Sequence, residues 1–256
     1  LHYSGNKRLQ LDAKYNVILS MIWKITMLIG NGMMAKQFVR YEDNKDVLIF
    51  ASGVSNSKET QVSEFEREFI LLQETITNNP EKHFVYFGTS SMYDPMARHS
   101  PYVLHKLAME QYVIENCKSY NIFRISQVIG RANNPTLVNF IVNNIIYDKE
   151  FDVWEHATRN LIALDDVYKI IDYILVNKIN VNQIVNVANS HNISIVDFIH
   201  IVEDVIGKKS KMKIVSKGFP FDEIDISLIK PYLKKLKIGF TNRNYYADAL
   251  LVIMMS

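Results

Sequence analysis

The sequence predicts an α/β protein built on one mainly parallel sheet with helices on both faces. Short runs of β-branched and aromatic residues alternate along the chain with longer stretches whose apolar residues recur at helical spacing. The chain has 256 residues, of which 48% are hydrophobic and 22% charged, and this balance is typical of a folded protein with a large core. We therefore expect one main domain, alone or with a smaller lobe.

The bulk properties argue against several classes of protein. A net charge of +2 gives no strong field, and the basic clusters at residues 208–213 and 230–237 are expected to be solvated faces rather than a nucleic-acid surface. The single cysteine, Cys117, excludes an internal disulfide and suits a reducing cytoplasm. No apolar run reaches the roughly 18 residues of a membrane span, and the histidines lack metal-ligand spacing. We expect a cytoplasmic protein with no metal, membrane or nucleic-acid partner.

The first strand and helix enclose a glycine turn. Residues 24–29 are a predicted strand, and Gly30-Asn31-Gly32-Met33-Met34-Ala35 follows as G-x-G-x-x-A at the start of a helix. Gly30 allows the tight turn, Gly32 lets the backbone approach a pyrophosphate, and Ala35 lets helix and strand pack closely. The turn therefore predicts a dinucleotide site, with a merely structural turn as the alternative.

The segment after this turn is short. The next predicted strand, residues 46–51, begins sixteen positions after Gly30, which leaves room for one short helix. The acid that would bind the adenosine ribose belongs about twenty residues beyond the turn, where the chain has Phe50-Ala51-Ser52. Glu42 and Asp43 are the nearest carboxylates, and both fit a polar loop equally well.

The next strand carries hydroxyl groups at its end. Residues 60–77 are a predicted helix whose inward apolar residues are Phe65, Phe69, Leu72 and Ile76. Residues 84–87 are a predicted strand. That strand would deliver four small residues to the carboxyl edge of the sheet: Gly88, Thr89, Ser90 and Ser91.

A tyrosine and a lysine lie one turn apart on the helix that follows. Ser100-Pro101 is a typical helix start, and it places Tyr102 and Lys106 on one face. A phenol, with a reference pKa near 10, transfers protons poorly at neutral pH, and a nearby ammonium stabilises the phenolate. Thr89 can bind the same substrate oxygen. The pair therefore indicates acid–base chemistry.

The Tyr-x-x-x-Lys spacing alone is weak evidence. It also occurs at Tyr3/Lys7 and Tyr41/Lys45. Only Tyr102/Lys106 lies on a capped helix after a strand that ends in hydroxyl residues. The alternative is an ordinary surface helix with a half-buried tyrosine.

Strands and helices continue to alternate towards the carboxyl terminus. Residues 122–128 are a predicted strand, a helix begins at Asp165, and residues 184–187 form a last short strand. A further helix is capped by Ser194 and ends at Gly207.

Taken in this order, the motifs resemble the extended short-chain dehydrogenase/reductases, the NAD-dependent epimerase/dehydratase group. The segments that carry the resemblance start at Asp46, Thr89, Ser100, Arg124, Arg159 and Val185. The resemblance implies a Rossmann-like doubly wound parallel sheet, shortened on the adenosine side, with a small C-terminal substrate lobe.

The implied domain boundaries divide the chain into three parts. We expect an N-terminal extension at residues 1–23, a cofactor domain at 24–130 and 158–190, and a substrate-binding lobe at 131–157 and 191–256.

The resemblance also implies roles for the site residues. Tyr102 would be the proton donor or acceptor, Lys106 would bind the nicotinamide ribose and favour the phenolate, and Thr89 would bind the reacting oxygen. The implied contacts to NAD or NADP are Gly30, Gly32, Met33, Met34, Ala35, Ala51, Ser52, Gly53 and Lys106. The implied substrate contacts are Ser90, Ser91, Gln127 and Arg159. A surface ion pair is the alternative for Arg159.

The implied function is an NAD(P)-dependent oxidoreductase acting on a nucleotide-activated sugar. Ser90 and Ser91 replace the acidic pair of sugar 4,6-dehydratases, so a keto-sugar reductase or an epimerase is favoured over a dehydratase. Glu68 stands where the family often has a helix asparagine, and the nucleotide half is short. A non-catalytic cofactor-sensing or scaffold protein of the same fold is therefore the alternative.

The resemblance further implies a homodimer. Its interface would form from the helices beginning near Thr60 and Pro101. Val103, Leu107 and Ile114 offer an apolar stripe there, and core packing would produce the same pattern.

Overall fold

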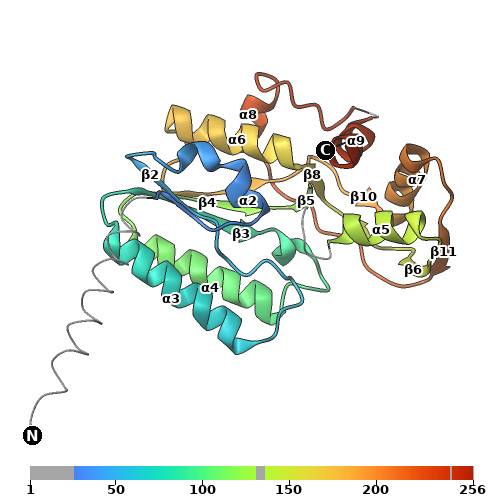
Figure 1. The fold of residues 1–256 in the computed structure, drawn as a ribbon, viewed down its shortest axis with the longest axis horizontal. Coiled ribbons are helices and arrows are strands. Elements are labelled where there is room, and N and C mark those ends of the chain that lie inside the picture. The colour runs from blue at the N-terminus through green and yellow to red at the C-terminus, as the bar shows by residue number, and fades with distance from the viewer. Residues whose placement is uncertain (1–25, 131–135, 243, 256) are drawn as a thin grey trace, which may run out of the picture.

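A computed structural model describes residues 26–130, 136–242 and 244–255. Its main sheet has five parallel strands in the order β1-β2-β3-β4-β9 (Figure 1). These strands span Leu28–Ile29, Val47–Phe50, His83–Thr89, Tyr120–Ile125 and Gln183–Val187. The expected parallel α/β fold is confirmed. The proposed extension at residues 1–23 lies outside the described residues.

Helices cover both faces of this sheet (Figure 1). One face carries α3 (Val62–Asn78) and α4 (Pro101–Asn116), whose Leu72 and Val113 pack on the strands. The opposite face carries three elements: α2 (Met33–Gln37), a 3-10 turn (Val39–Tyr41) and α6 (Leu164–Asn177). The strands are buried on both faces, which explains their near-continuous apolar runs.

Among the described residues, β1 is the edge strand of the sheet, with no strand beyond it. Within the described residues, β1 pairs only with β2, so nothing extends the sheet on the side where the adenosine-binding strands would lie. The expected shortening is therefore present in this part of the chain. The strand order also never reverses there, because β1 is the edge strand rather than a central one.

The connection from β1 to β2 has an unusual handedness. It leads to the next strand of the sheet in the same direction as the connection from β2 to β3. However, Phe38 at the end of α2 packs with α6, whereas α3 lies on the opposite face. Two connections that step in the same direction across a parallel sheet, but pass over opposite faces, have opposite handedness. If β2-to-β3 is right-handed, as the general rule requires, then β1-to-β2 is left-handed. This geometry is expected when the strands between α2 and β2 are missing.

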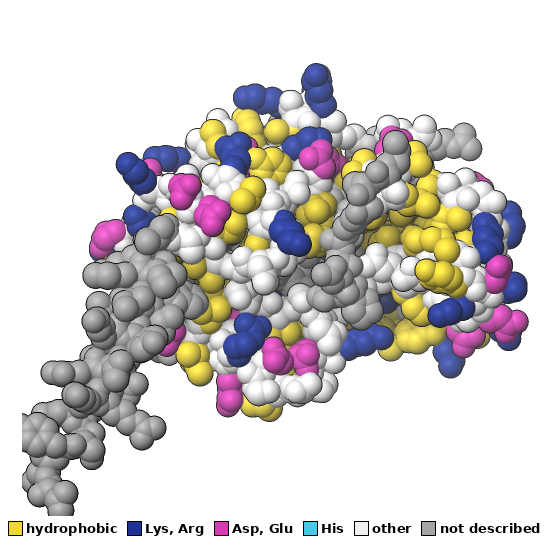
Figure 2. Space-filling model, in the orientation of Figure 1, with side chains coloured by type: hydrophobic (Ala, Val, Ile, Leu, Met, Phe, Trp, Pro, Cys, Tyr) yellow, Lys and Arg dark blue, Asp and Glu magenta, His cyan; other side chains and the backbone are white. Residues whose placement is uncertain are grey.

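A second core lies in the lobe formed by the later part of the chain. It is built mainly from α5 (Leu137–Ile146), α7 (Ile195–Ile206) and α9 (Tyr245–Met255). The remaining helix, α8 (Lys230–Leu233), lies instead beside α6, where Tyr232 packs on Tyr173. The short strands are β5 (Gln127–Ile129), β6 (Glu150–Trp154), β7 (Thr158–Arg159), β8 (Leu161–Ala163), β10 (Ile193–Ser194) and β11 (Lys211–Val215). These strands pair two by two, as β5 with β8, β7 with β10 and β6 with β11. Figure 2 shows hydrophobic side chains gathered over this lobe.

Several local predictions can be compared with the structure. Ser100 accepts a hydrogen bond from the Val103 amide at the start of α4, and Ser194 caps α7 in the same way. Gly207 ends α7 with φ +73°, as its position predicted. The single strand predicted for residues 122–128 is wrong, because the chain leaves the main sheet at Ser126 and continues as β5 in another sheet.

Among the described residues, no helix combines the length and apolarity needed to cross a membrane, and no cluster of three metal-ligating side chains occurs.

Candidate active site

Tyr102 and Lys106 lie in the first two turns of α4, which the Ser100 cap and Pro101 hold in place. Both side chains point inward. Tyr102 is 8% exposed and Lys106 only 3%. A buried lysine needs partners for its charge, so this geometry differs from that of an ordinary surface helix.

Tyr102 lies between two loops at the carboxyl ends of strands. It packs in one cluster with Val54, which follows β2, and with Met92, which follows β3. Val103 belongs to the same buried cluster, so this member of the apolar stripe on α4 is a core residue. The tyrosine is thus at the edge of the sheet where open α/β proteins bind ligands.

The hydroxyl residues after β3 form a tight turn. The Thr89 hydroxyl donates to the Ser91 hydroxyl over 3.0 Å and accepts from the Ser91 amide over 3.1 Å. Ser90 points the other way, since it is 1% exposed and its hydroxyl donates to the Arg124 carbonyl oxygen. Ser90 is therefore part of the core, whereas Thr89, 7% exposed, and the half-buried Ser91 bond to each other.

Lys106 is bound to a carboxylate that is completely buried. Its ammonium donates to Glu68 Oε1 over 3.0 Å, to the Tyr86 hydroxyl over 3.1 Å and to the Phe87 carbonyl oxygen over 3.4 Å. Three acceptors match the three hydrogens of an ammonium. Each donor of Lys106 thus has an acceptor within the protein.

Glu68 makes four hydrogen bonds. Besides Lys106, its Oε1 accepts from the Tyr86 hydroxyl over 2.6 Å. Its Oε2 accepts from the Val54 amide over 2.6 Å and pairs with His105 Nε2 over 3.0 Å. The carboxylate therefore ties α3 to α4, to β3 and to the loop after β2.

The charges in this network favour the ionised carboxylate. Burial alone would raise the pKa of Glu68, but the Lys106 ammonium and the hydrogen bonds from His105, Tyr86 and the Val54 amide lower it to about 2. Burial, followed by the charge of Glu68, raises the pKa of Tyr86 well above its ordinary value. Tyr86 is therefore a neutral donor to Glu68.

Gly53 closes over this ion pair. A side chain at position 53 would collide with the Lys106 ammonium and the Glu68 carboxylate. Only a glycine lets the backbone of the loop lie against the pair so closely. The predicted cofactor loop, Ala51 to Gly53, is thus in direct contact with the predicted catalytic lysine.

The glycine turn is formed as the motif predicts. Gly30 has φ +129° and no room for a side chain, because a Cβ there would meet the Ala51 carbonyl. Gly32 is exposed and has open space around it, and Ala35 is buried against the sheet. Met33 lies against Gly130 after β5, which leaves Met34 to pack beside the first core. Open space over Gly32 fits the approach of a pyrophosphate.

The adenosine side fits a dinucleotide less well. Among the described residues, the edge at β1 has no neighbouring strand, and the positions after β2 carry Ala51 and Ser52 rather than an acid. Few groups of the described residues are therefore available to an adenosine on this side of the sheet.

Arg159, a predicted substrate contact, is paired within the protein. Arg159 approaches Asp94 at 3.6 Å and donates to the Thr158 carbonyl. Both partners are largely buried, so this is not the surface ion pair that stood as the alternative for Arg159. Gln127 is exposed on β5, outside the main sheet.

Two features escaped the sequence patterns. Arg124 forms a bidentate ion pair with Glu110 of α4, with its shortest contact at 2.6 Å. The Glu68 network is the second. Glu68 lies among the inward positions Phe65, Phe69 and Leu72 of α3, and a carboxylate on an apolar helix face was the available signal for a buried ion pair.

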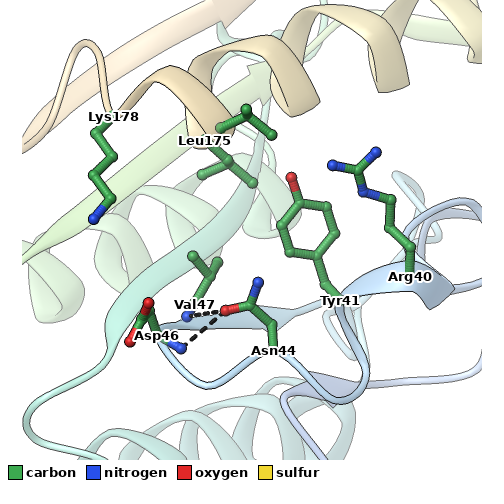
Figure 3. A pocket seen from close by; sticks show the side chains of 8 residues that line it. Arg40, Tyr41, Asn44, Asp46, Val47, Leu175 and Lys178 are labelled. Carbon is green, nitrogen blue, oxygen red and sulfur yellow. Dashed lines mark hydrogen bonds between the residues drawn. The ribbon is translucent and has the colours of Figure 1, made fainter.

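One cavity of the described residues lies away from this site. It holds about 300 Å³ and is lined by Arg40, Tyr41, Asn44, Asp46, Val47, Leu175, Val176 and Lys178. Figure 3 shows it beside the amino-terminal end of β2, where Asn44 accepts from two backbone amides. Since ligands of open α/β sheets bind at the carboxyl ends of the strands, this cavity is separate from the candidate site.

A parallel sheet between two helical layers, with a glycine turn after β1 and polar side chains at the carboxyl ends of its strands, defines a Rossmann-type protein. More narrowly, residues 36–188 match the model of the NAD dependent epimerase/dehydratase family, and the chain belongs to this family. The resemblance inferred from the motifs is confirmed. No curated protein is significantly similar to the chain.

Solved structures of similar fold are distant in sequence. UDP-N-acetylglucosamine 4-epimerase from Methanobrevibacter ruminantium M1, in complex with UDP-N-acetylmuramic acid, is 18% identical with a TM-score of 0.65, over 85% of this chain and 78% of that one. UDP-glucose 4-epimerase from Thermus thermophilus, in complex with NAD, is 15% identical with a TM-score of 0.65, over 85% and 81%. dTDP-glucose 4,6-dehydratase from Bacillus anthracis str. Ames, in complex with NAD, is 15% identical with a TM-score of 0.60, over 84% and 78%.

Proposed function

We propose that this protein is an NAD(P)-dependent oxidoreductase that acts on a nucleotide-activated sugar, as a keto-sugar reductase or an epimerase. The observation that carries the proposal is the position of Tyr102, buried between the loop after β2 and the turn after β3, one helical turn from Lys106. Family membership and the neighbours crystallised with NAD or a UDP-sugar support it.

The glycine turn and the loop after β2 would hold the cofactor. The phosphates would lie over the backbone of Gly30 to Ala35, where Gly32 leaves space, and the nicotinamide half would lie along Ala51 to Gly53. Bound there, NAD(P) would supply the hydride acceptor or donor. The polypeptide supplies binding, orientation and proton transfer.

The proton chemistry would belong to Tyr102. Its phenol gives a proton to a substrate oxygen during reduction and takes one during oxidation, with the positive charge of Lys106 favouring the phenolate. Thr89 orients the same oxygen through its hydroxyl, which already lies in a hydrogen-bonded turn with Ser91. We propose Ser91 as a substrate contact, and Gln127 and Arg159 as outer contacts to the nucleotide part.

Dehydration fits this site poorly. Elimination of water needs an acid and a base at the two positions after Thr89. Ser90 and Ser91 hold those positions, and the Ser90 hydroxyl is buried against the Arg124 carbonyl. A reductase or an epimerase needs only the tyrosine, the lysine and the threonine.

A non-catalytic, cofactor-sensing or scaffold protein is the second candidate. Two observations favour it, namely the absence of strands beyond β1 among the described residues and the complete engagement of Lys106 with Glu68, Tyr86 and Phe87. Such a protein would bind a dinucleotide or a nucleotide-sugar without turnover. We also propose a cytoplasmic location, from the single reduced cysteine, and a homodimer.

The test combines cofactor stoichiometry with one substitution. The full chain is incubated with keto and hydroxyl nucleotide-sugars and each of NAD, NADH, NADP and NADPH, and products and cofactor are quantified. Net NADH or NADPH consumption identifies a reductase, and sugar inversion without net consumption identifies an epimerase. Tyr102→Phe should lower the rate by about 10²- to 10⁴-fold. Unchanged turnover in that variant removes the mechanism, and binding without turnover supports the second candidate.

A further inference from the structure

The Glu68–Lys106 pair gives Lys106 a role that the motif alone does not predict. An ammonium has three hydrogens, and all three point at acceptors within the protein, on Glu68, Tyr86 and Phe87. A ribose hydroxyl of a bound dinucleotide would need one of these hydrogens. Lys106 therefore cannot bind a ribose without giving up a partner that it already has.

Glu68 is the partner that holds the ammonium most firmly. It is the only acceptor of the three that carries a charge, and it is fully buried. Charge-assisted hydrogen bonds are about twice as strong as neutral ones. The Phe87 carbonyl, at 3.4 Å, is the weakest contact. Any exchange of partners is therefore opposed mainly by the carboxylate.

The carboxylate itself is fixed from three other directions. Tyr86 on β3, His105 on α4 and the Val54 amide after β2 each bond to it. His105 is held in turn by Phe65, whose ring stacks on it with centroids 4.7 Å apart. If the Lys106 ammonium moves, these bonds keep Glu68 in place. Movement of Lys106 therefore breaks the ion pair.

We infer that Glu68 is a positioning residue that binds the Lys106 ammonium beneath Gly53 and withholds it from the ribose of a bound dinucleotide. Lys106 reaches the cofactor only when this ion pair opens. The inference rests on the proposed function, because it concerns the affinity of the same cofactor site. Dinucleotide affinity in this protein is therefore limited by residue 68 as well as by its short adenosine side.

The experiment is a fluorescence titration of the full chain with NADH, repeated with NADPH. Glu68→Gln removes the charge that holds Lys106, so the freed ammonium gains a bond to the ribose and the Kd should fall about tenfold. In Glu68→Gln/Lys106→Met the gain should vanish. The matched control is Glu64→Gln, one turn earlier on α3, where an exposed carboxylate paired with Arg67 is lost and the Kd should not change.

Glu68→Asp covers the case in which Glu68→Gln does not fold. The shorter side chain keeps the buried negative charge but draws it away from the Lys106 ammonium, so the Kd should fall, by less than in Glu68→Gln. A Kd that is unchanged or higher in folded Glu68→Asp would overturn the inference. An unchanged or weaker Kd in folded Glu68→Gln would overturn it as well.

Failure of the proposed function looks different. If neither NADH nor NADPH binds to any variant, the cofactor site is wrong, and the ion pair is judged by thermal unfolding alone. The Tm of Lys106→Met should then lie below that of the double variant, because the single variant leaves a buried carboxylate without its cation. A Tm equal to or above that of the double variant overturns the pairing itself.

Discussion

At the scale of single residues, Glu68 decides how the candidate site behaves. A motif assigns Tyr102 and Lys106 from their spacing, but spacing carries no information on what else the lysine contacts. The structure shows that Glu68 and Lys106 form a buried ion pair within a hydrogen-bonded network. A family role for Lys106 in this chain therefore depends on a residue 38 positions away.

The pKa of Glu68 predicts an acid-sensitive step in stability. Because the folded pKa is depressed to about 2, this carboxylate stabilises the fold above its ordinary pKa and loses the effect as the pH falls towards 2. The loss should be about 3 kcal/mol between pH 4.5 and pH 2. Urea unfolding across this range measures it.

The control for this experiment is Glu68→Gln/Lys106→Met, which keeps the shape of the pair without its charges. Its unfolding free energy should depend less steeply on pH in the same window. Equal slopes in the two proteins would mean that other carboxylates, such as the exposed ones with lowered pKa values at Asp148 and Glu150, account for the acid sensitivity.

At the scale of elements, the turn between β1 and α2 has two glycines from which we expect different roles. Gly30 is expected to be structural, and Gly32 is expected to serve in cofactor binding. Gly30→Ala should destabilise the fold by about 1–3 kcal/mol, because its φ of +129° and the Ala51 carbonyl exclude a side chain. Gly32→Ala should leave stability within about 0.5 kcal/mol, since φ is −75° and nothing lies nearby, yet weaken dinucleotide binding. Urea unfolding and NADH titration measure the two effects. A Gly32→Ala variant that binds NADH as before would mean that the pyrophosphate lies elsewhere.

Local sequence signals predicted where helices begin and end better than they predicted which strands pair or which helices pack together. Ser100, Ser194 and Gly207 mark helix ends through hydrogen bonds and dihedral angles that depend on neighbouring residues only. The break at Ser126 depends on β5 pairing with β8, more than thirty residues later, and no local pattern encodes it. In the site, the order of Thr89, Tyr102 and Lys106 was readable, whereas the partner of Lys106 required the packing of α3 against α4.

At the scale of the whole molecule, the described main sheet has five parallel strands with β1 at one edge, and a lobe with a second core lies beside it. The left-handed β1-to-β2 connection and the edge position of β1 have one explanation, the lack of strands between them in the chain. Cofactor contacts would therefore be concentrated on the pyrophosphate and the nicotinamide half, which predicts weaker binding than in a complete fold.

The proposed dimer is also a property of the whole molecule. Leu104 on α4 and Ile70 on α3 are each 54% exposed, although Val103 and Leu72 beside them are buried. Leu104→Arg should convert a dimer into a monomer, measured by sedimentation. Val176→Arg, at a 59% exposed apolar position on α6, is the control and should leave the dimer intact. A native chain that already sediments as a monomer contradicts the proposal.

The most direct test of the central claim, that a dinucleotide binds over the glycine turn beside Tyr102, is calorimetric titration of the unaltered chain with NAD, NADH, NADP and NADPH. The account predicts saturable binding of at least one of them, at one site per chain. If none of the four gives saturable binding heat, the claim is contradicted. The protein would then have the fold of its family without binding the cofactor.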